Sequence, residues 1–191
     1  MEILNKVLPA TFIELPIDPL LFQSQRTRFA FGRNNTVIPI MHRKVTEDML
    51  KFVLNRGQQP KFQVDIPRPI IPAVYIHGPR GVGKSYSLFE VVWLLRADPH
   101  NRVIYIPDCG GWSGTFIERT LELMVEAVCV AFCEDKEVLE YCDAVQLEES
   151  QLGRFLEWLP QFCMQKGLHL YAIFDQHNGL EVEFLKKKLH L

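Results

Sequence analysis

The sequence predicts an α/β fold with a parallel sheet. Short apolar runs that read as buried strands, at residues 70–77, 102–106 and 168–175, alternate with longer segments whose apolar residues recur at helical spacing. Strands covered on both faces read as continuous apolar runs, and parallel strands need helical crossovers between them. The composition agrees, because 48% of the 191 residues are hydrophobic and 23% are charged, as in a typical globular chain.

The first 69 residues predict an extension in front of the core. Residues 1–40 contain four prolines and no sustained apolar period. The run from Thr46 to Asn55 fits one short helix, with Thr46 as its N-cap. Prolines at positions 60, 67, 69 and 72 then mark a linker. We therefore expect an N-terminal extension with one short helix (1–69) and an α/β core (70–191).

Three helices are expected in the core. A nearly all-apolar helix follows the first strand and ends near Asp98. Residues 115–132 and 151–166 carry two further amphipathic patterns. Pro160 is expected to kink the last helix and Gly167 to end it.

The most specific motif lies between the first strand and the first core helix. It matches G-x-x-x-x-G-K-[ST], a loop that wraps nucleotide phosphates, over Gly78, Pro79, Arg80, Gly81, Val82, Gly83, Lys84 and Ser85. Its glycines let backbone N–H groups turn inward, and the helix N-terminus adds positive potential. Lys84 is expected to reach the β- and γ-phosphates, and Ser85 to offer its hydroxyl to Mg²⁺. The motif predicts a site for a nucleoside triphosphate, which we expect to be ATP with Mg²⁺.

A carboxylate for the metal is expected at the end of a neighbouring strand, and Asp175 ends the third apolar run. Asp175 is therefore the Walker B candidate. Gln176 follows it where many ATPases carry a glutamate that activates water. Glutamine cannot take a proton but can orient water, so slow hydrolysis and a nucleotide switch both stay open. The candidate catalytic residues are Lys84, Asp175 and Gln176.

Two further strings follow the second and third strands: Tyr105-Ile106-Pro107-Asp108-Cys109-Gly110 and Phe174-Asp175-Gln176-His177-Asn178. Together with the phosphate loop they resemble the P-loop NTPase region of Crinkler-type effectors and retrotransposon hot spot proteins, over about residues 70–178. The resemblance implies a STAND or AAA+-like ATPase core, a three-layer α/β/α P-loop fold, with Walker A at 78–85 and Walker B at Asp175. It also implies an effector domain as partner and action in the nucleus.

The core is expected to be incomplete at its C-terminus. Only three strands are expected after the linker, fewer than the resemblance implies for an AAA+-type sheet. Such a short parallel sheet would leave an unpaired edge, which is a place where another chain can pair.

Net charge and cysteine content limit the kinds of binding partner and the cell compartment that the sequence predicts. A net charge of -2 gives no overall attraction to nucleic acid or to an anionic membrane. The N-terminus lacks the pattern of a signal peptide, and no apolar stretch approaches the ~20 residues that cross a bilayer. Five cysteines without a CxxC pair suit a reducing compartment. We therefore expect an intracellular protein, cytoplasmic or, from the resemblance alone, nuclear.

Two other functions stay open. One is a non-enzymatic nucleotide-binding or protein-interaction module, that is, a degenerate NTPase fragment that recruits a partner. The other is a small-molecule kinase, which needs a lid rich in arginine, and the arginines after the loop do not cluster. ATP hydrolysis that depends on Lys84 would separate the first alternative from an ATPase.

Overall fold

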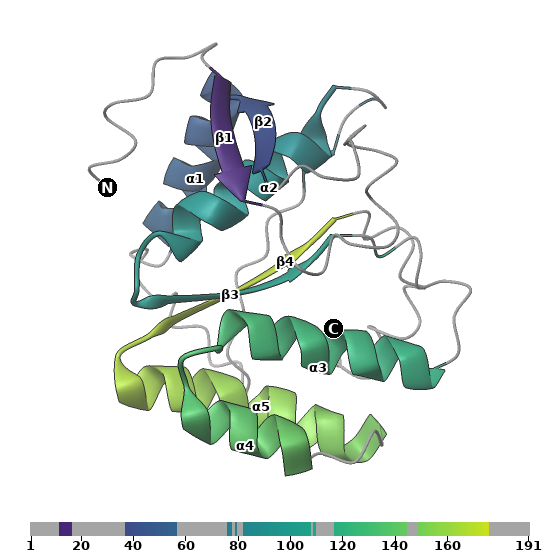
Figure 1. Cartoon of the computed structure of the whole chain (residues 1–191). Coiled ribbons are helices and arrows are strands. Elements are labelled where there is room, and N and C mark those ends of the chain that lie inside the picture. The colour runs from purple at the N-terminus through teal and green to yellow at the C-terminus, as the bar shows by residue number, and fades with distance from the viewer. Residues whose placement is uncertain are drawn as a thin grey trace, which may run out of the picture.

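The computed structural model describes residues 12–16, 37–56, 76–77, 79, 82–107, 109, 117–144 and 149–175. The elements in this part of the chain are shown in Figure 1. In chain order they are β1 (Phe12–Pro16), β2 (Val37–Met41), α1 (Lys44–Arg56), α2 (Lys84–Arg96), β3 (Asn101–Ile106), α3 (Ile117–Ala131), α4 (Lys136–Ala144), α5 (Glu149–Lys166) and β4 (His169–Phe174).

The centre of the described structure is a small parallel sheet of β3 and β4. The two strands pair in register from Asn101 opposite His169 to Ile106 opposite Phe174. Helices lie between these strands in the chain, so the expected α/β character is confirmed at this coarse level. The expected strand at 70–77 lies outside the described residues apart from its last two.

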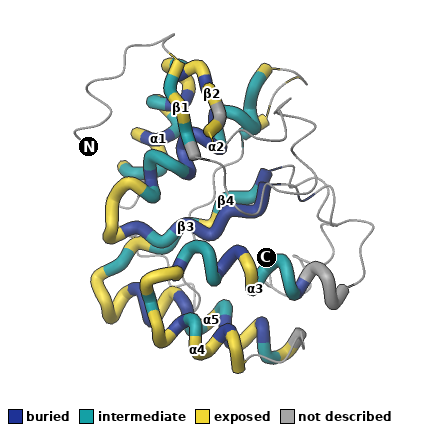
Figure 2. The backbone as a smooth tube through the Cα atoms, viewed as in Figure 1, coloured by how far each residue is buried: buried dark blue, intermediate teal, exposed yellow. Residues whose placement is uncertain are grey.

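Helices cover both faces of this sheet (Figure 1). On one face lie α1 and α2 with the β1–β2 pair, and on the other lie α3, α4 and α5. Successive side chains of a strand point to opposite faces. Accordingly, Val103 and Tyr105 of β3 pack with α2, whereas Ile104 and Ile106 pack with α3 and α5. The continuous apolar run of β3 is therefore explained by burial on both sides, which Figure 2 shows as a dark strand.

The α3–α5 side holds a core rich in aromatic rings. Phe132 and Phe155 are fully buried there, and the rings of Phe132 and Phe162 meet edge to face with centroids 6.3 Å apart. Tyr141 stacks on Phe155 and on Trp158, with centroid distances of 4.8 and 5.1 Å. Such pairs add to the burial of their apolar area. All five cysteines of the chain are free thiols.

The N-terminal part contributes more than the single helix that the sequence pattern predicts. The expected helix at 46–55 is α1, but β1 and β2 also form an antiparallel pair, with Phe12 opposite Met41 and Ile13 opposite Ile40. Ile40 and Leu50 are buried in one cluster with Phe89 of α2. The described N-terminal residues therefore share a hydrophobic core with the helix that follows the phosphate loop.

Helix α5 ends as the sequence predicts. Gly167 adopts the left-handed conformation, with φ 68°. The Leu168 N–H donates to the Cys163 carbonyl (2.8 Å) and the Gly167 N–H to the Met164 carbonyl (3.3 Å), which is the Schellman pattern. Pro160 lies inside α5 and is exposed.

No helix among the described residues is long and apolar enough to cross a bilayer.

Candidate functional site

The described part of the phosphate-loop motif comprises Pro79 and the residues from Val82 to Ser85; Gly78, Arg80 and Gly81 lie outside it. Helix α2 begins at Lys84, and Gly83 precedes it in the left-handed conformation, with φ 83° and ψ 22°. The Gly83 carbonyl accepts the N–H of Ser87 (3.0 Å), which forms the first helical turn. A left-handed residue at this position favours glycine. The motif therefore opens a helix, as its pattern requires.

Lys84 folds back over the loop. Its Nζ donates to the Pro79 carbonyl at 2.7 Å. This contact places the ammonium group beside the loop backbone, where a phosphate could replace the carbonyl as its acceptor. Ser85 is half-buried in the first turn of the same helix.

A second cation, Arg43, reaches the same loop from the junction of β2 and α1. Its Nη1 donates to the Val82 carbonyl at 2.8 Å. The guanidinium also lies against Gly83: a Cβ there would overlap it, with Arg43 Cζ only 3.0 Å away. The positive φ favours glycine at position 83, and a side chain there would also displace the Arg43 guanidinium. No carboxylate among the described residues lies within ion-pair distance of Arg43.

His42, the residue before Arg43, is the centre of a buried ionisable cluster. Its Nδ1 faces the Glu90 carboxylate of α2, and its Nε2 lies 3.2 Å from a carboxylate oxygen of Glu47 in α1. His42 is 1% exposed and Glu90 is 0% exposed. Burial acts to lower the pKa of His42, but the hydrogen bonds and charges of Glu90 and Glu47 outweigh it and leave the pKa raised above 6.5.

Asp175 follows the last residue of β4, where β3 also ends. It is only 4% exposed. Its N–H donates to the Ile106 carbonyl (2.9 Å), and its own carbonyl accepts the N–H of Cys109 (3.0 Å). Cys109 and Asp175, the described residues just beyond β3 and β4, are therefore side by side at the carboxyl end of the sheet. Gln176, like Asp108, Gly110, His177 and Asn178, lies outside the described residues.

The loop and Asp175 belong to the same end of the molecule. Helix α2 runs back along the sheet to the short turn before β3, so its N-terminus lies toward the end where β3 and β4 finish (Figure 1). Ser85 supplies a hydroxyl oxygen and Asp175 a buried carboxylate, and these are donor types that Mg²⁺ accepts. Mg²⁺ bound with a nucleotide needs only one or two protein oxygens. The donor set fits Mg²⁺ with a nucleoside triphosphate.

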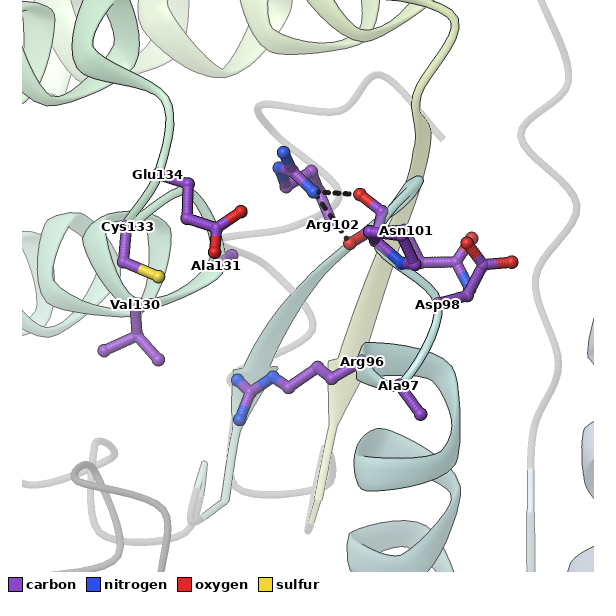
Figure 3. Close-up of a pocket in the computed structure, with 10 residues that line it drawn as sticks. Arg96, Ala97, Asp98, Asn101, Arg102, Val130, Ala131, Cys133 and Glu134 are labelled. Atoms are coloured by element: carbon purple, nitrogen blue, oxygen red, sulfur yellow. Dashed lines mark hydrogen bonds between the residues drawn. The ribbon is translucent and has the colours of Figure 1, made fainter. Parts of the chain in front are cut away.

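A surface cavity of about 250 Å³ lies at the opposite, amino end of β3 (Figure 3). Its guanidinium groups are engaged within the protein. Arg102 pairs with Asp135 and donates to the carbonyls of Pro99 and Asn101, and Arg96 donates to the carbonyl of Val103 and lies over the Trp93 ring. These contacts join β3 to its flanking turns, and we assign no ligand to this cavity.

The sequence predicted a role for the loop and for Asp175, and it gave no prediction for Arg43, His42, Glu47 and Glu90. Arg43 and Val82 are 39 positions apart, and His42 and Glu90 are 48 apart. The sequence did contain one indication of this cluster. Glu90 lies inside the apolar run of α2, and a charged residue that is buried there needs a partner.

No family model matches the chain, and no solved structure matches it. The chain is similar to the chromosomal replication initiator protein DnaA of Nitrobacter winogradskyi, with 28% identity over 149 residues. The matched region is 78% of this chain and 26% of that protein, so the chain spans about a quarter of the length of the curated relative it matches. The similarity is to a replication initiator and not to a Crinkler-type or retrotransposon hot spot protein.

Proposed function

We propose that this chain is an ATP-binding P-loop NTPase of the STAND or AAA+-like kind, which holds Mg²⁺-ATP with Walker A (78–85) and Walker B (Asp175). The observation that carries the proposal is the convergence of Lys84 and Arg43 on a loop whose left-handed Gly83 opens helix α2. The similarity to a replication initiator supports the same class of protein.

The loop would bind phosphate through three features of this chain. The first backbone N–H groups of α2 have no helical partner, and the helix dipole adds positive potential there. Lys84 would exchange the Pro79 carbonyl for a phosphate oxygen. Arg43 adds a second positive charge beside Val82. Each charge-assisted hydrogen bond to phosphate contributes about 1.5–3 kcal/mol.

Ser85 and Asp175 are the residues that would hold Mg²⁺, which neutralises charge on the β- and γ-phosphates when it is bound. Asp175 is kept in place by the two backbone hydrogen bonds that tie it to the end of β3. Gln176 follows in the chain and would orient water without accepting its proton. Hydrolysis by this site would therefore be slow.

The effector-domain partner and the nuclear site of action that the sequence resemblance implies remain proposals of the same kind. Five free thiols are consistent with a reducing compartment inside the cell. A net charge of -2 gives no overall attraction to nucleic acid, so the proposed binding of nucleotide rests on the local cations of the loop.

The test is calorimetric titration of the purified chain with Mg²⁺-ATP and Mg²⁺-GTP, with phosphate release followed on the same samples. Lys84→Ala should weaken ATP binding by about tenfold to a hundredfold, which corresponds to one charge-assisted hydrogen bond. Lys136→Ala is the matched control, because Lys136 is 88% exposed on α4 and its side chain pairs with Glu140 one turn away on the same helix. Equal ATP affinity in Lys84→Ala and wild type would remove the phosphate-loop assignment.

Phosphate release separates the ATPase from the non-enzymatic nucleotide-binding module. Turnover that disappears with Lys84→Ala would establish an ATPase. Binding without turnover would instead establish the non-enzymatic nucleotide-binding module.

A further inference from the structure

The cluster of His42, Glu47 and Glu90 has no part in the proposed binding of phosphate, yet it is buried. Glu90 is fully buried in the face of α2 that packs on α1, among apolar neighbours such as Phe89 and Val92. One oxygen of its carboxylate faces His42, and the other has no hydrogen-bond partner among the described residues. Burying a carboxylate is costly unless it is paired. A purely structural packing site would be served better by an apolar side chain.

The geometry defines the charge of the histidine. Both ring nitrogens of His42 face carboxylate oxygens, Nδ1 toward Glu90 and Nε2 toward Glu47. Ionised carboxylates only accept hydrogen bonds, and a neutral imidazole has a single N–H. With both carboxylates ionised, both contacts are hydrogen bonds only when His42 is a doubly protonated imidazolium.

This cluster adjoins Arg43, the cation that contacts the phosphate loop. Arg43 is the next residue, and its carbonyl accepts the N–H of Thr46 (2.9 Å), which fixes its backbone at the start of α1. The β2–α1 turn is thus attached at two points, one on α2 and one on the phosphate loop. One is the pair of His42 with Glu90, and the other is the hydrogen bond from Arg43 to Val82.

We propose that His42, Glu47 and Glu90 form a protonation-dependent positioning site, which holds Arg43 against the phosphate loop and so makes nucleotide affinity depend on the charge of His42. The inference rests on the proposed nucleotide site. His42 and Glu90 are positioning residues, because they act on the ligand through Arg43. Loss of the proton breaks one of the two carboxylate contacts, releases the β2–α1 turn from α2 and moves Arg43 away from Val82.

The charged groups around His42 agree with this direction. Glu90 faces it from α2 and Glu47 from α1, and Glu47 in turn pairs with Lys51, whose Nζ lies 3.6 Å from its second oxygen. Burial lowers the pKa of His42, and the two carboxylates more than compensate and raise it above 6.5. The imidazolium is therefore present at and somewhat above the ordinary histidine pKa and is lost as the pH rises further.

The experiment measures the Mg²⁺-ATP affinity of the full chain over a pH range that starts below the ordinary histidine pKa of about 6.5 and extends above it. Wild-type affinity should fall with rising pH, by at most about tenfold per pH unit because one proton is linked. His42→Gln should bind ATP weakly at every pH, without this step. ATP has its own proton, but that contribution is common to all variants and cancels in the comparison.

A second variant isolates the route through Arg43 and keeps the test valid if His42→Gln does not fold. Arg43→Gln leaves the buried cluster intact, so His42 still titrates, but the pH step in ATP affinity should disappear. Arg154→Ala is the matched control, since Arg154 is exposed on α5, on the other side of the sheet, and should keep the wild-type profile. A histidine that served only packing would leave the Arg43→Gln profile as steep as that of wild type.

Each outcome decides the matter. Wild type that binds ATP, with a pH step that both His42→Gln and Arg43→Gln abolish, supports the positioning site. Wild type that binds ATP, with the same step in Arg43→Gln, overturns it while the proposed function stands. Wild type that binds no nucleotide, at the same level as Lys84→Ala, overturns the proposed function and this inference with it.

Discussion

The two sides of the parallel sheet bury different kinds of residue. On the side of α3, α4 and α5, the described buried residues are apolar side chains and thiols. On the side of α1 and α2, the buried set also includes His42, Thr46, Ser87 and Glu90. A buried ion pair often adds no more stability than apolar residues of similar volume, so stability alone does not account for the polar groups on this side. This difference favours a function beside α2, whose first residues end the phosphate loop.

The largest loss of stability is expected when a buried aromatic side chain on the α3–α5 side of the sheet, the apolar side, is truncated. Phe132 is fully buried, meets the ring of Phe162, and lies 6.0 Å below the guanidinium of Arg102. Phe132→Ala leaves a cavity and should lower the free energy of unfolding by about 3–5 kcal/mol, measured by urea denaturation.

Met164→Ala is the control for this substitution, because Met164 is 76% exposed and its truncation should change stability little. ATP affinity of the folded Phe132→Ala protein should equal that of wild type. A large loss of affinity in the folded variant would contradict the division of labour between the two sides.

On the α1–α2 side of the sheet, the polar side, the loss of stability from one apolar substitution should be recovered by a second. His42→Leu leaves the buried Glu90 carboxylate without its partner and should cost about 3 kcal/mol of stability. The double variant His42→Leu/Glu90→Leu removes both charges and should recover most of this loss, because a buried ion pair is often replaced by apolar residues at no net cost. Urea denaturation of the two single variants and the double variant measures the coupling.

A stable double variant that has also lost the pH step in ATP affinity would show that the pair serves the site more than the fold. Additive losses in the double variant would instead make the cluster an ordinary part of the core.

A smaller effect is expected from pH alone, since the imidazole then stays in place and only its proton changes. The pKa of His42 is raised in the folded chain, by Glu90 and Glu47 acting against burial. Its contribution to stability is therefore complete below the unfolded value of about 6.5 and is lost as the pH rises through the folded pKa. The melting temperature of wild type should decline over that interval more steeply than that of His42→Leu/Glu90→Leu. Parallel declines would assign the pH dependence to other groups.

Local pattern was enough to predict the elements whose residues are close in sequence. The helices expected at 46–55, 115–132 and 151–166 are α1, α3 and α5, and the strands expected at 102–106 and 168–175 are β3 and β4. In each, the apolar spacing matches the face that is buried in the structure. Helix α4 was not predicted, since it is short and its nine residues bury only Val138 and Cys142.

The features that the sequence did not predict depend on contacts between residues far apart in the chain. The β1–β2 pair joins two five-residue strands around a long intervening segment, and neither strand shows strict alternation. The loop and Asp175 were recognised from motif chemistry alone, and their roles as ligands remain proposals. Arg43 and His42 resemble any surface arginine and histidine until folding brings them to Val82 and Glu90. Such partners cannot be read from spacing along one chain.

The smallest changes in stability are expected at two glycines on the α3–α5 side of the sheet. At these positions only the backbone preferences of helix α5 should determine the change. Gly167 ends α5 with φ 68°, and a Cβ there would meet nothing within 4 Å, so the cost of Gly167→Ala is backbone strain of roughly 1–2 kcal/mol. Gly153 lies inside the same helix, exposed and equally unobstructed, and Gly153→Ala should stabilise the protein by about 0.5–1 kcal/mol. Neither substitution should change ATP affinity or its pH profile. Opposite shifts in melting temperature at unchanged affinity would show that this side of the sheet can be tuned without reaching the phosphate loop, whereas altered affinity in either variant would mean that the two sides are coupled.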